Sequence, residues 1–182
     1  MLETVGFMEF NSIARGVAAA DTVLKTADVE VVFSRSGCPG KYYLLFTGEV
    51  AAVQASLDAA KCMAGDHVVD SCLIPRVHPQ VVRAIHMTAM PETMGAVGVM
   101  EFFSVTASVY SADAAVKAAA VELIDLRLGT GIGGKSFVIL TGEVAAVQSA
   151  IDAGVHTPAA AGMLVDSVVI PAPHPDLLET LL

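Results

Sequence analysis

Short runs of alternating hydrophobic and polar residues recur along the chain, separated by segments with a longer, helical period. Residues 5–10 and 29–34 alternate residue by residue, which is typical of β-strands. The continuous apolar run at 42–46 indicates a strand that is covered on both faces. Residues 68–74 complete a set of four strands, and Pro75 ends the last of them.

Two segments between these strands carry apolar residues at the spacing of a helical face. In the first, Ser12 can cap the helix, and one face carries Ile13, Val17, Ala20, Leu24 and Ala27. The second opens at Glu49, and its apolar side carries Val50, Val53, Leu57 and Ala60. A stripe of this kind is typical of a helix that packs on a core. A third, short helix is predicted from Pro79 to Ile85.

This whole pattern occurs twice, because the second half of the chain repeats the first. The segment Thr47–Gln54 recurs without change as Thr141–Gln148. Further matches follow in the same order: Val5–Phe10 with Val97–Phe102, Asp21 and Lys25 with Asp113 and Lys117, Val69–Ser71 with Val165–Ser167, and His78-Pro79 with His174-Pro175. The offset is 92 at first, then 94 and finally 96, so the second copy carries two short insertions.

For the second copy, the same reasoning predicts strands at 97–102, 121–128, 136–141 and 164–170, helices at 104–119, 143–153 and 176–181, and a loop at 129–135. The predicted class is α+β, with two tandem domains that each form a four-stranded antiparallel sheet with helices packed on it. We place the first domain at residues 1–88, a linker at 89–95 and the second domain at 96–182.

Composition narrows the range of partners. Hydrophobic residues make up 54% of the chain, but no apolar run approaches the ~18 residues that would indicate a membrane span. The net charge of −9 argues against nucleic acid, whose phosphates require clustered Lys and Arg. The chain shows no secretory signal, and its three cysteines form no disulfide framework. We therefore expect a reducing cytosol as its compartment.

The most distinctive stretch is Ser36–Lys41, a tight loop between two apolar strands with Cys38 at its tip. The glycines beside this cysteine permit positive φ and let backbone amides approach a sulfur atom. The proline that follows it stiffens the loop. Cys62 falls in a predicted helix and Cys72 in a predicted strand, and we interpret both as buried small apolar residues.

Together these features resemble the bacterial microcompartment (BMC) shell domain, which has a ferredoxin-like α+β fold. The resemblance rests on the order of strands and helices, on the Gly-rich loop, and on the motifs Asp21-x-x-x-Lys25, Thr47-Gly-Glu-Val and Ile74-Pro-Arg-Val-His78-Pro. Two such domains in one chain resemble the tandem-domain shell proteins. Cys-Pro-Gly-Lys at 38–41 resembles the iron–sulfur-carrying type of propanediol-utilisation shells.

The resemblance implies a structural protein, not an enzyme, that assembles as a homotrimer imitating a hexamer in the shell of a cytoplasmic microcompartment. Cys38 of three chains would then hold one [4Fe-4S] cluster on the three-fold axis, for electron transfer across the shell or delivery of clusters. Implied partners are other shell proteins and a redox enzyme or flavoprotein of the lumen. The implied pore loops are Gly37, Pro39 and Gly40 in copy one and Ile132, Gly133 and Gly134 in copy two.

Three residues match contacts that join neighbouring tiles in this family. Lys25 and Lys117 match the edge lysine, and Arg76 matches the arginine that inserts into the next tile. The second copy has Ala172 in place of that arginine, so its edges are expected to be weaker or differently partnered. A solvated helix face is the other interpretation of both lysines.

Three alternatives stay open for the chemistry. The same trimer with an empty axis would be a pore for a small polar metabolite. Three thiolates and a water could hold zinc in place of a cluster. Gly129–Ser136 matches the phosphate-loop pattern GxxxxGK[ST] of nucleotide-binding proteins. That motif requires a helix directly after the loop, whereas residues 136–141 are predicted to form a strand.

Overall fold

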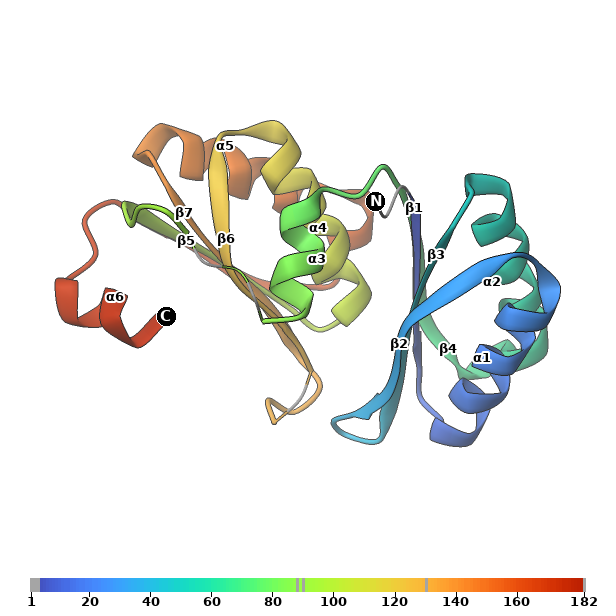
Figure 1. The fold of residues 1–182 in the computed structure, drawn as a ribbon. Helices are drawn as coiled ribbons and strands as arrows, with labels where there is room; N and C mark the ends of the chain where they lie inside the picture. Colours follow the sequence, from blue (N-terminus) through green and yellow to red (C-terminus); the bar gives the residue numbers. More distant parts are fainter. Residues whose placement is uncertain (1–3, 88, 90, 130, 182) are drawn as a thin grey trace. The chain divides into compact units, whose positions relative to one another are not determined.

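The structure is a computed structural model that describes residues 4–87, 89, 91–129 and 131–181 (Figure 1). Contacts divide these residues into two compact units. The first comprises the residues up to Val77 together with the loop Gly129–Gly134, and the second comprises His78–Leu128 and the residues from Lys135 onward. No helix among the described residues is long and apolar enough to cross a membrane.

The first unit contains one sheet and two long helices. Its elements are β1 (Thr4–Phe10), α1 (Ile13–Thr26), β2 (Val29–Gly37), β3 (Lys41–Gly48), α2 (Val50–Ala64) and β4 (Val68–Pro75). The strands are ordered β2-β3-β1-β4, and each neighbouring pair is antiparallel. Both helices lie on the same face of this sheet (Figure 1).

The second unit repeats this arrangement. Its elements are α3 (Pro79–Ile85), β5 (Ala96–Phe102), α4 (Val105–Ala118), β6 (Val121–Leu128), β7 (Ser136–Gly142), α5 (Val144–Val155), β8 (Leu164–Ile170) and α6 (Pro175–Leu181). The strand order β6-β7-β5-β8 matches that of the first sheet. The predicted fold class is therefore confirmed. The predicted domain limits stay a prediction, and by its contacts α3 groups with the second unit.

Alternation along β1 separates two apolar layers in the first unit. Met8 and Phe10 face the helices, where they join a buried cluster with residues of β3, α1 and α2. On the opposite face, Phe7 stacks on Tyr43 with ring centroids 6.3 Å apart and meets Phe33 edge to face. The sheet is thus covered by packed side chains on both faces, as the apolar run of β3 predicts.

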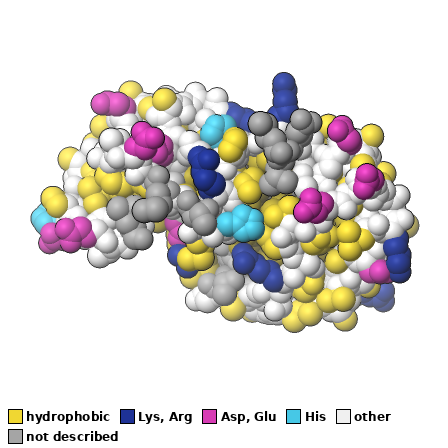
Figure 2. All heavy atoms as spheres, viewed as in Figure 1, with side chains coloured by type: hydrophobic (Ala, Val, Ile, Leu, Met, Phe, Trp, Pro, Cys, Tyr) yellow, Lys and Arg dark blue, Asp and Glu magenta, His cyan; other side chains and the backbone are white. Residues whose placement is uncertain are grey.

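The predicted packing face of α1 is wrong. Ile13, Val17 and Leu24 are 45%, 53% and 54% exposed, whereas the residues that α1 buries are Gly16, Ala19 and Val23. The reason is close approach, because small residues let the helix axis come nearer to the sheet than a row of branched side chains would. Elsewhere too, hydrophobic side chains reach the surface between charged ones (Figure 2).

Gly16 of α1 lies against the Tyr42 side chain of β3. A Cβ at this position would lie 2.3 Å from Cδ1 of Tyr42, so a side chain has no room there. The repeat places Ser108 and Ser136 at these two positions in the second copy, both buried. The first copy therefore pairs a glycine with a tyrosine here, whereas the second copy has a buried serine at each of the two positions.

We expect Gly16→Ala to lower the free energy of unfolding by about 1–3 kcal/mol, because overpacking outweighs the higher helix propensity of alanine. The measurement is urea unfolding of the single variant and of the same change in a Tyr42→Ser background. The penalty should shrink in that background because most of the opposing ring is gone. An equal penalty in both backgrounds would show that the contact with Tyr42 does not limit this position.

Candidate functional site

The tip of the β2–β3 hairpin carries Cys38. Gly37 and Lys41 form the last pair of the ladder, and the Gly40 N–H donates to the Gly37 carbonyl at 2.9 Å, which closes the turn. Gly40 has φ of +95°, a conformation that side-chain-bearing residues rarely adopt, and the Cys38–Pro39 peptide is cis. The thiol is half-buried. These residues form the turn between β2 and β3, and their place at a pore stays a prediction.

Tyr43 contacts this loop through both its hydroxyl and its ring. Its hydroxyl donates to the Cys38 carbonyl at 3.3 Å, and a Cβ on Gly37 would lie 2.1 Å from the Tyr43 ring. Burial, followed by the charges of Glu9 and Cys38, raises the pKa of the Tyr43 hydroxyl well above its usual value, so it stays a donor at neutral pH. Sequence reasoning missed this residue because the second copy has Phe137 there and gives no repeat signal.

A buried ion pair lies next to the hairpin. Lys41 Nζ donates to Glu9 Oε1, and the Glu9 side chain is fully buried. The second copy repeats the pair between Lys135 and Glu101 at 2.9 Å, where both side chains are more exposed. The sequence carried a signal for this pair, because a glutamate and a lysine recur at matching positions of the two copies.

The glycine-rich loop Gly129–Gly134 joins β6 to β7 of the second sheet. By its contacts this loop belongs to the first unit. The Gly131 N–H donates to the Cys38 sulfur at 3.4 Å. A Cβ on Gly134 would lie 2.6 Å from Pro39, so this approach also requires a glycine. Gly133 and Gly134 have positive φ, and Ile132 is half-buried. A backbone donor thus points at the Cys38 sulfur.

Each chain contributes one thiol, that of Cys38, to this hairpin loop. Among the residues that the structure describes, no three His, Cys, Asp or Glu side chains are grouped so that they could hold a metal ion. Cys62 is exposed on α2, so its interpretation as a buried residue is wrong, and Cys72 is half-buried in β4. A cluster or zinc at Cys38 therefore requires thiols from several chains.

The phosphate-loop interpretation of Gly129–Ser136 lacks its structural requirement. The strand β7 begins at Ser136, where a nucleotide-binding loop would be followed by a helix. Ser136 is buried and donates to the Ser104 carbonyl at 2.8 Å, and Lys135 pairs with Glu101. The two side chains that would contact phosphate and magnesium are thus engaged elsewhere.

The predicted edge residues differ in their surroundings. Lys25 pairs with Asp21 on the exposed surface of α1 at 2.6 Å. Lys117 pairs with Asp113, whose other oxygen accepts the His78 N–H at 2.8 Å. Arg76 is exposed and has a positive φ of 49° after β4. Their roles in contacts between tiles stay predictions.

Comparison with known proteins assigns the fold to a family. The model of the BMC domain matches residues 4–77 and again 96–173. The chain belongs to the BMC domain family. Its resemblance to tandem-domain shell proteins is confirmed, because the bacterial microcompartment shell protein PduT of Citrobacter freundii is 38% identical over 96% of this chain and 95% of its own.

Other relatives match the whole chain or one copy. A microcompartment protein from Desulfitobacterium hafniense, known from its crystal structure, is 48% identical with a TM-score of 0.86, covering 98% of this chain and 99% of that one. The shell protein EutM of Salmonella typhimurium is 40% identical over 87 residues, which cover 47% of this chain and 88% of EutM. The chain thus has the domain content of two such proteins in tandem.

We expect Lys41→Met to lower the free energy of unfolding by about 3 kcal/mol, because it removes the ion-pair partner of a fully buried carboxylate. Lys135→Met is the matched control in the second copy and should cost less than about 1 kcal/mol, because its pair is partly hydrated. Urea unfolding of both variants at pH 7 measures the difference. Equal costs would contradict the structural role given to the Glu9–Lys41 pair.

Removing the Tyr43 hydroxyl should loosen the cysteine loop. In a chain with Cys62→Ser and Cys72→Ser, Tyr43→Phe should raise the rate at which Cys38 reacts with a maleimide about five-fold, which corresponds to one lost hydrogen bond of ~1 kcal/mol. Tyr42→Phe is the control, because the Tyr42 hydroxyl bonds to Ser34, away from the loop. Equal rates in both variants would refute the tether.

Proposed function

We propose that this chain is a structural tile of a bacterial microcompartment shell in which three copies bind one iron–sulfur cluster, of the [4Fe-4S] type, through Cys38. The observation that carries the proposal is a half-buried thiol at a hairpin tip that accepts a backbone N–H from Gly131. Membership of the BMC family and the similarity to PduT support the shell role.

The residues present fit such a group. Iron–sulfur clusters are bound by cysteine thiolates, usually four, and each chain offers one at this loop. Three chains would leave one iron for a water, a small ligand or a residue of a partner protein. Amide N–H groups near the sulfur stabilise its charge and influence the reduction potential of a bound cluster.

When bound, the cluster would supply one-electron chemistry within the shell wall. The residues of this chain would hold the thiol in place through Tyr43 and Gly37 and bring the Gly131 amide to the sulfur. We infer that the tile lies in the shell of a microcompartment in the cytoplasm. Its partners would be other shell proteins, a family that includes PduA and EutM, and a redox enzyme or flavoprotein in the lumen.

An open pore is the second candidate. Five of the six predicted pore-loop residues are glycine or proline, and the same trimer without a cluster would leave a passage for a small polar metabolite between the loops. This candidate differs from the first only in what occupies the axis of the trimer.

Anaerobic purification separates the two candidates. We expect brown protein with about four iron and four sulfide per three chains, and we expect both to be lost in Cys38→Ser. Cys62→Ser is the matched control and should keep them, because that thiol lies on α2, away from the loop. Colourless protein without iron, after reconstitution with iron and sulfide, would contradict the cluster and favour the pore.

A further inference from the structure

The strand β2 carries a cation, Arg35, shortly before the cysteine loop. Arg35 pairs with Tyr43 in the ladder between β2 and β3. Its guanidinium carbon lies 4.6 Å from the centre of the Phe33 ring, and Phe33 in turn meets Phe7 edge to face, on the face of the sheet opposite the helices. Arg35 therefore lies on that same face, and the attraction of its charge to the ring limits the positions that the guanidinium takes.

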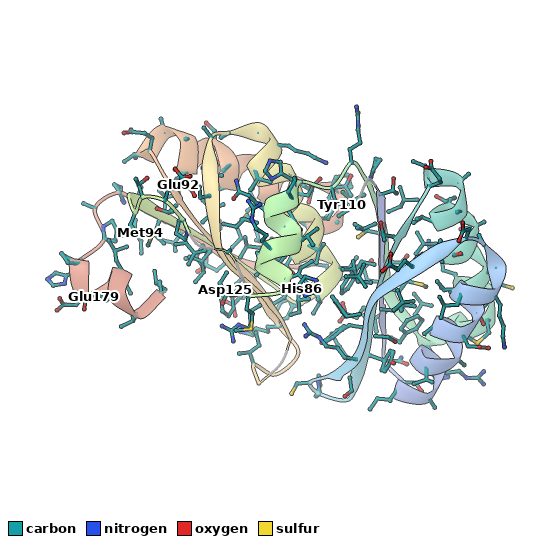
Figure 3. All side chains as sticks on the ribbon, viewed as in Figure 1. His86, Glu92, Met94, Tyr110, Asp125 and Glu179 are labelled. Carbon is teal, nitrogen blue, oxygen red and sulfur yellow. The ribbon has the colours of Figure 1, made fainter. Side chains whose placement is uncertain are left out.

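The second copy has the same arginine in a different setting. The repeat places Arg127 at the position of Arg35. It places Asp125, which lies on β6 (Figure 3), at the position of Phe33. Arg127 donates to Asp125 Oδ2 through Nε at 3.2 Å and through a terminal nitrogen at 2.8 Å. The charge of Arg127 is thus neutralised within its own strand.

Arg35 has no such acidic partner. Among the residues that the structure describes, no carboxylate forms an ion pair with its guanidinium. The Phe33 ring attracts the cation but leaves its charge uncompensated, and the side chain is exposed. This is notable in a chain with 19 acidic side chains and 10 Lys and Arg. A guanidinium of this kind presents a planar fork of N–H donors that fits carboxylate and phosphate oxygens.

The charge of Arg35 also acts close to the cysteine loop. Burial is the main cause that raises the pKa of the Tyr43 hydroxyl, followed by the charges of Glu9 and Cys38. The charge of Arg35 acts on the same hydroxyl in the opposite direction. That hydroxyl donates to the Cys38 carbonyl at 3.3 Å. An anion on Arg35 would therefore be held beside the loop that carries the thiol.

We propose that Arg35 is an anion-binding residue at the Cys38 loop, and that its guanidinium receives a phosphate or carboxylate group of a small molecule. Phe33 prepares the guanidinium for this contact by holding it in place, whereas the donors of Arg127 are already bound to Asp125. The consequence rests on the proposed function, because a small anionic electron carrier on Arg35 would lie beside the proposed cluster. Binding of the anion itself requires no iron.

The first test compares two disulfide reagents that react with the Cys38 thiol. One is dithiobis(nitrobenzoic acid), which carries carboxylates at neutral pH, and the other is neutral dithiodipyridine. In both reactions the cysteine thiolate displaces one sulfur of the reagent as a thiolate and forms a mixed disulfide. The protein is the full chain with Cys62→Ser and Cys72→Ser, freed of iron with a chelator. Arg35→Gln should lower the rate with the anionic reagent about five-fold, because it removes one partly screened charge, and should leave the rate with the neutral reagent unchanged.

Two further variants serve as controls. Arg127→Gln is matched to Arg35→Gln and should leave both rates unchanged, because Asp125 already neutralises that cation. Arg35→Lys should keep most of the rate with the anionic reagent, because the positive charge remains. An equal fall with both reagents in Arg35→Gln would mean that Arg35 only shapes the loop, and unchanged rates with both would mean that it binds no anion. Either result would overturn the proposal.

The second test identifies the group that binds. Sodium phosphate or sodium acetate is added at the ionic strength of a sodium chloride reference, so that general screening is equal. Phosphate, acetate or both should slow the reaction with the anionic reagent more than chloride does, and the salt that does so assigns the group. The extra effect should disappear in Arg35→Gln and persist in Arg127→Gln. Equal effects of all three salts would overturn the proposal.

Iron content keeps this inference separate from the cluster. After anaerobic reconstitution, Arg35→Gln should bind as much iron as the wild-type chain, because Arg35 supplies no thiol. Iron in both chains without any anion effect would overturn the anion site and leave the cluster in place. An anion effect in a chain that binds no iron would support the anion site while contradicting the cluster.

Discussion

The cysteine site depends on one close contact, between the ring of Tyr43 and the backbone of Gly37. A side chain at residue 37 would overlap the ring at 2.1 Å, and the Tyr43 hydroxyl bonds to the carbonyl of Cys38 itself. Because Tyr43 also stacks on Phe7 in β1, the thiol is tied to the middle of the sheet. A half-buried sulfur at a hairpin tip would otherwise move with the loop, and a shared metal site requires ligands held in place.

Duplication gives two copies of one fold that differ in sequence at the cysteine loop. The second copy has Ile132 at the position of Cys38 and Phe137 at the position of Tyr43. The thiol and the tyrosine hydroxyl that bonds to its loop therefore belong to the first copy alone. The framework residues stay the same, as the paired Glu9 and Glu101 show. Under the proposed function, each chain contributes one thiol to the cluster, so cluster binding would depend on the association of several chains.

Most of the fold followed from hydrophobic period and from the repeat, because a strand or helix found in one copy supports its equivalent in the other. The packing face of α1 did not follow. An apolar stripe at Ile13, Val17 and Leu24 looks the same in sequence whether it meets a core or another chain, and the closeness that favours Gly16 appears only with Tyr42 in place. The loop was predictable from its composition, whereas its tether to Tyr43 was not.

The most direct measurement of the central claim is the iron content of mixed oligomers. Wild-type and Cys38→Ser chains, unfolded together in equal amounts and reassembled anaerobically with iron and sulfide, form oligomers with a random number of thiols. If a cluster requires Cys38 from three chains, the iron content falls to about one eighth of the wild-type value. A fall to about one half would mean that each thiol binds iron independently, which would contradict the account.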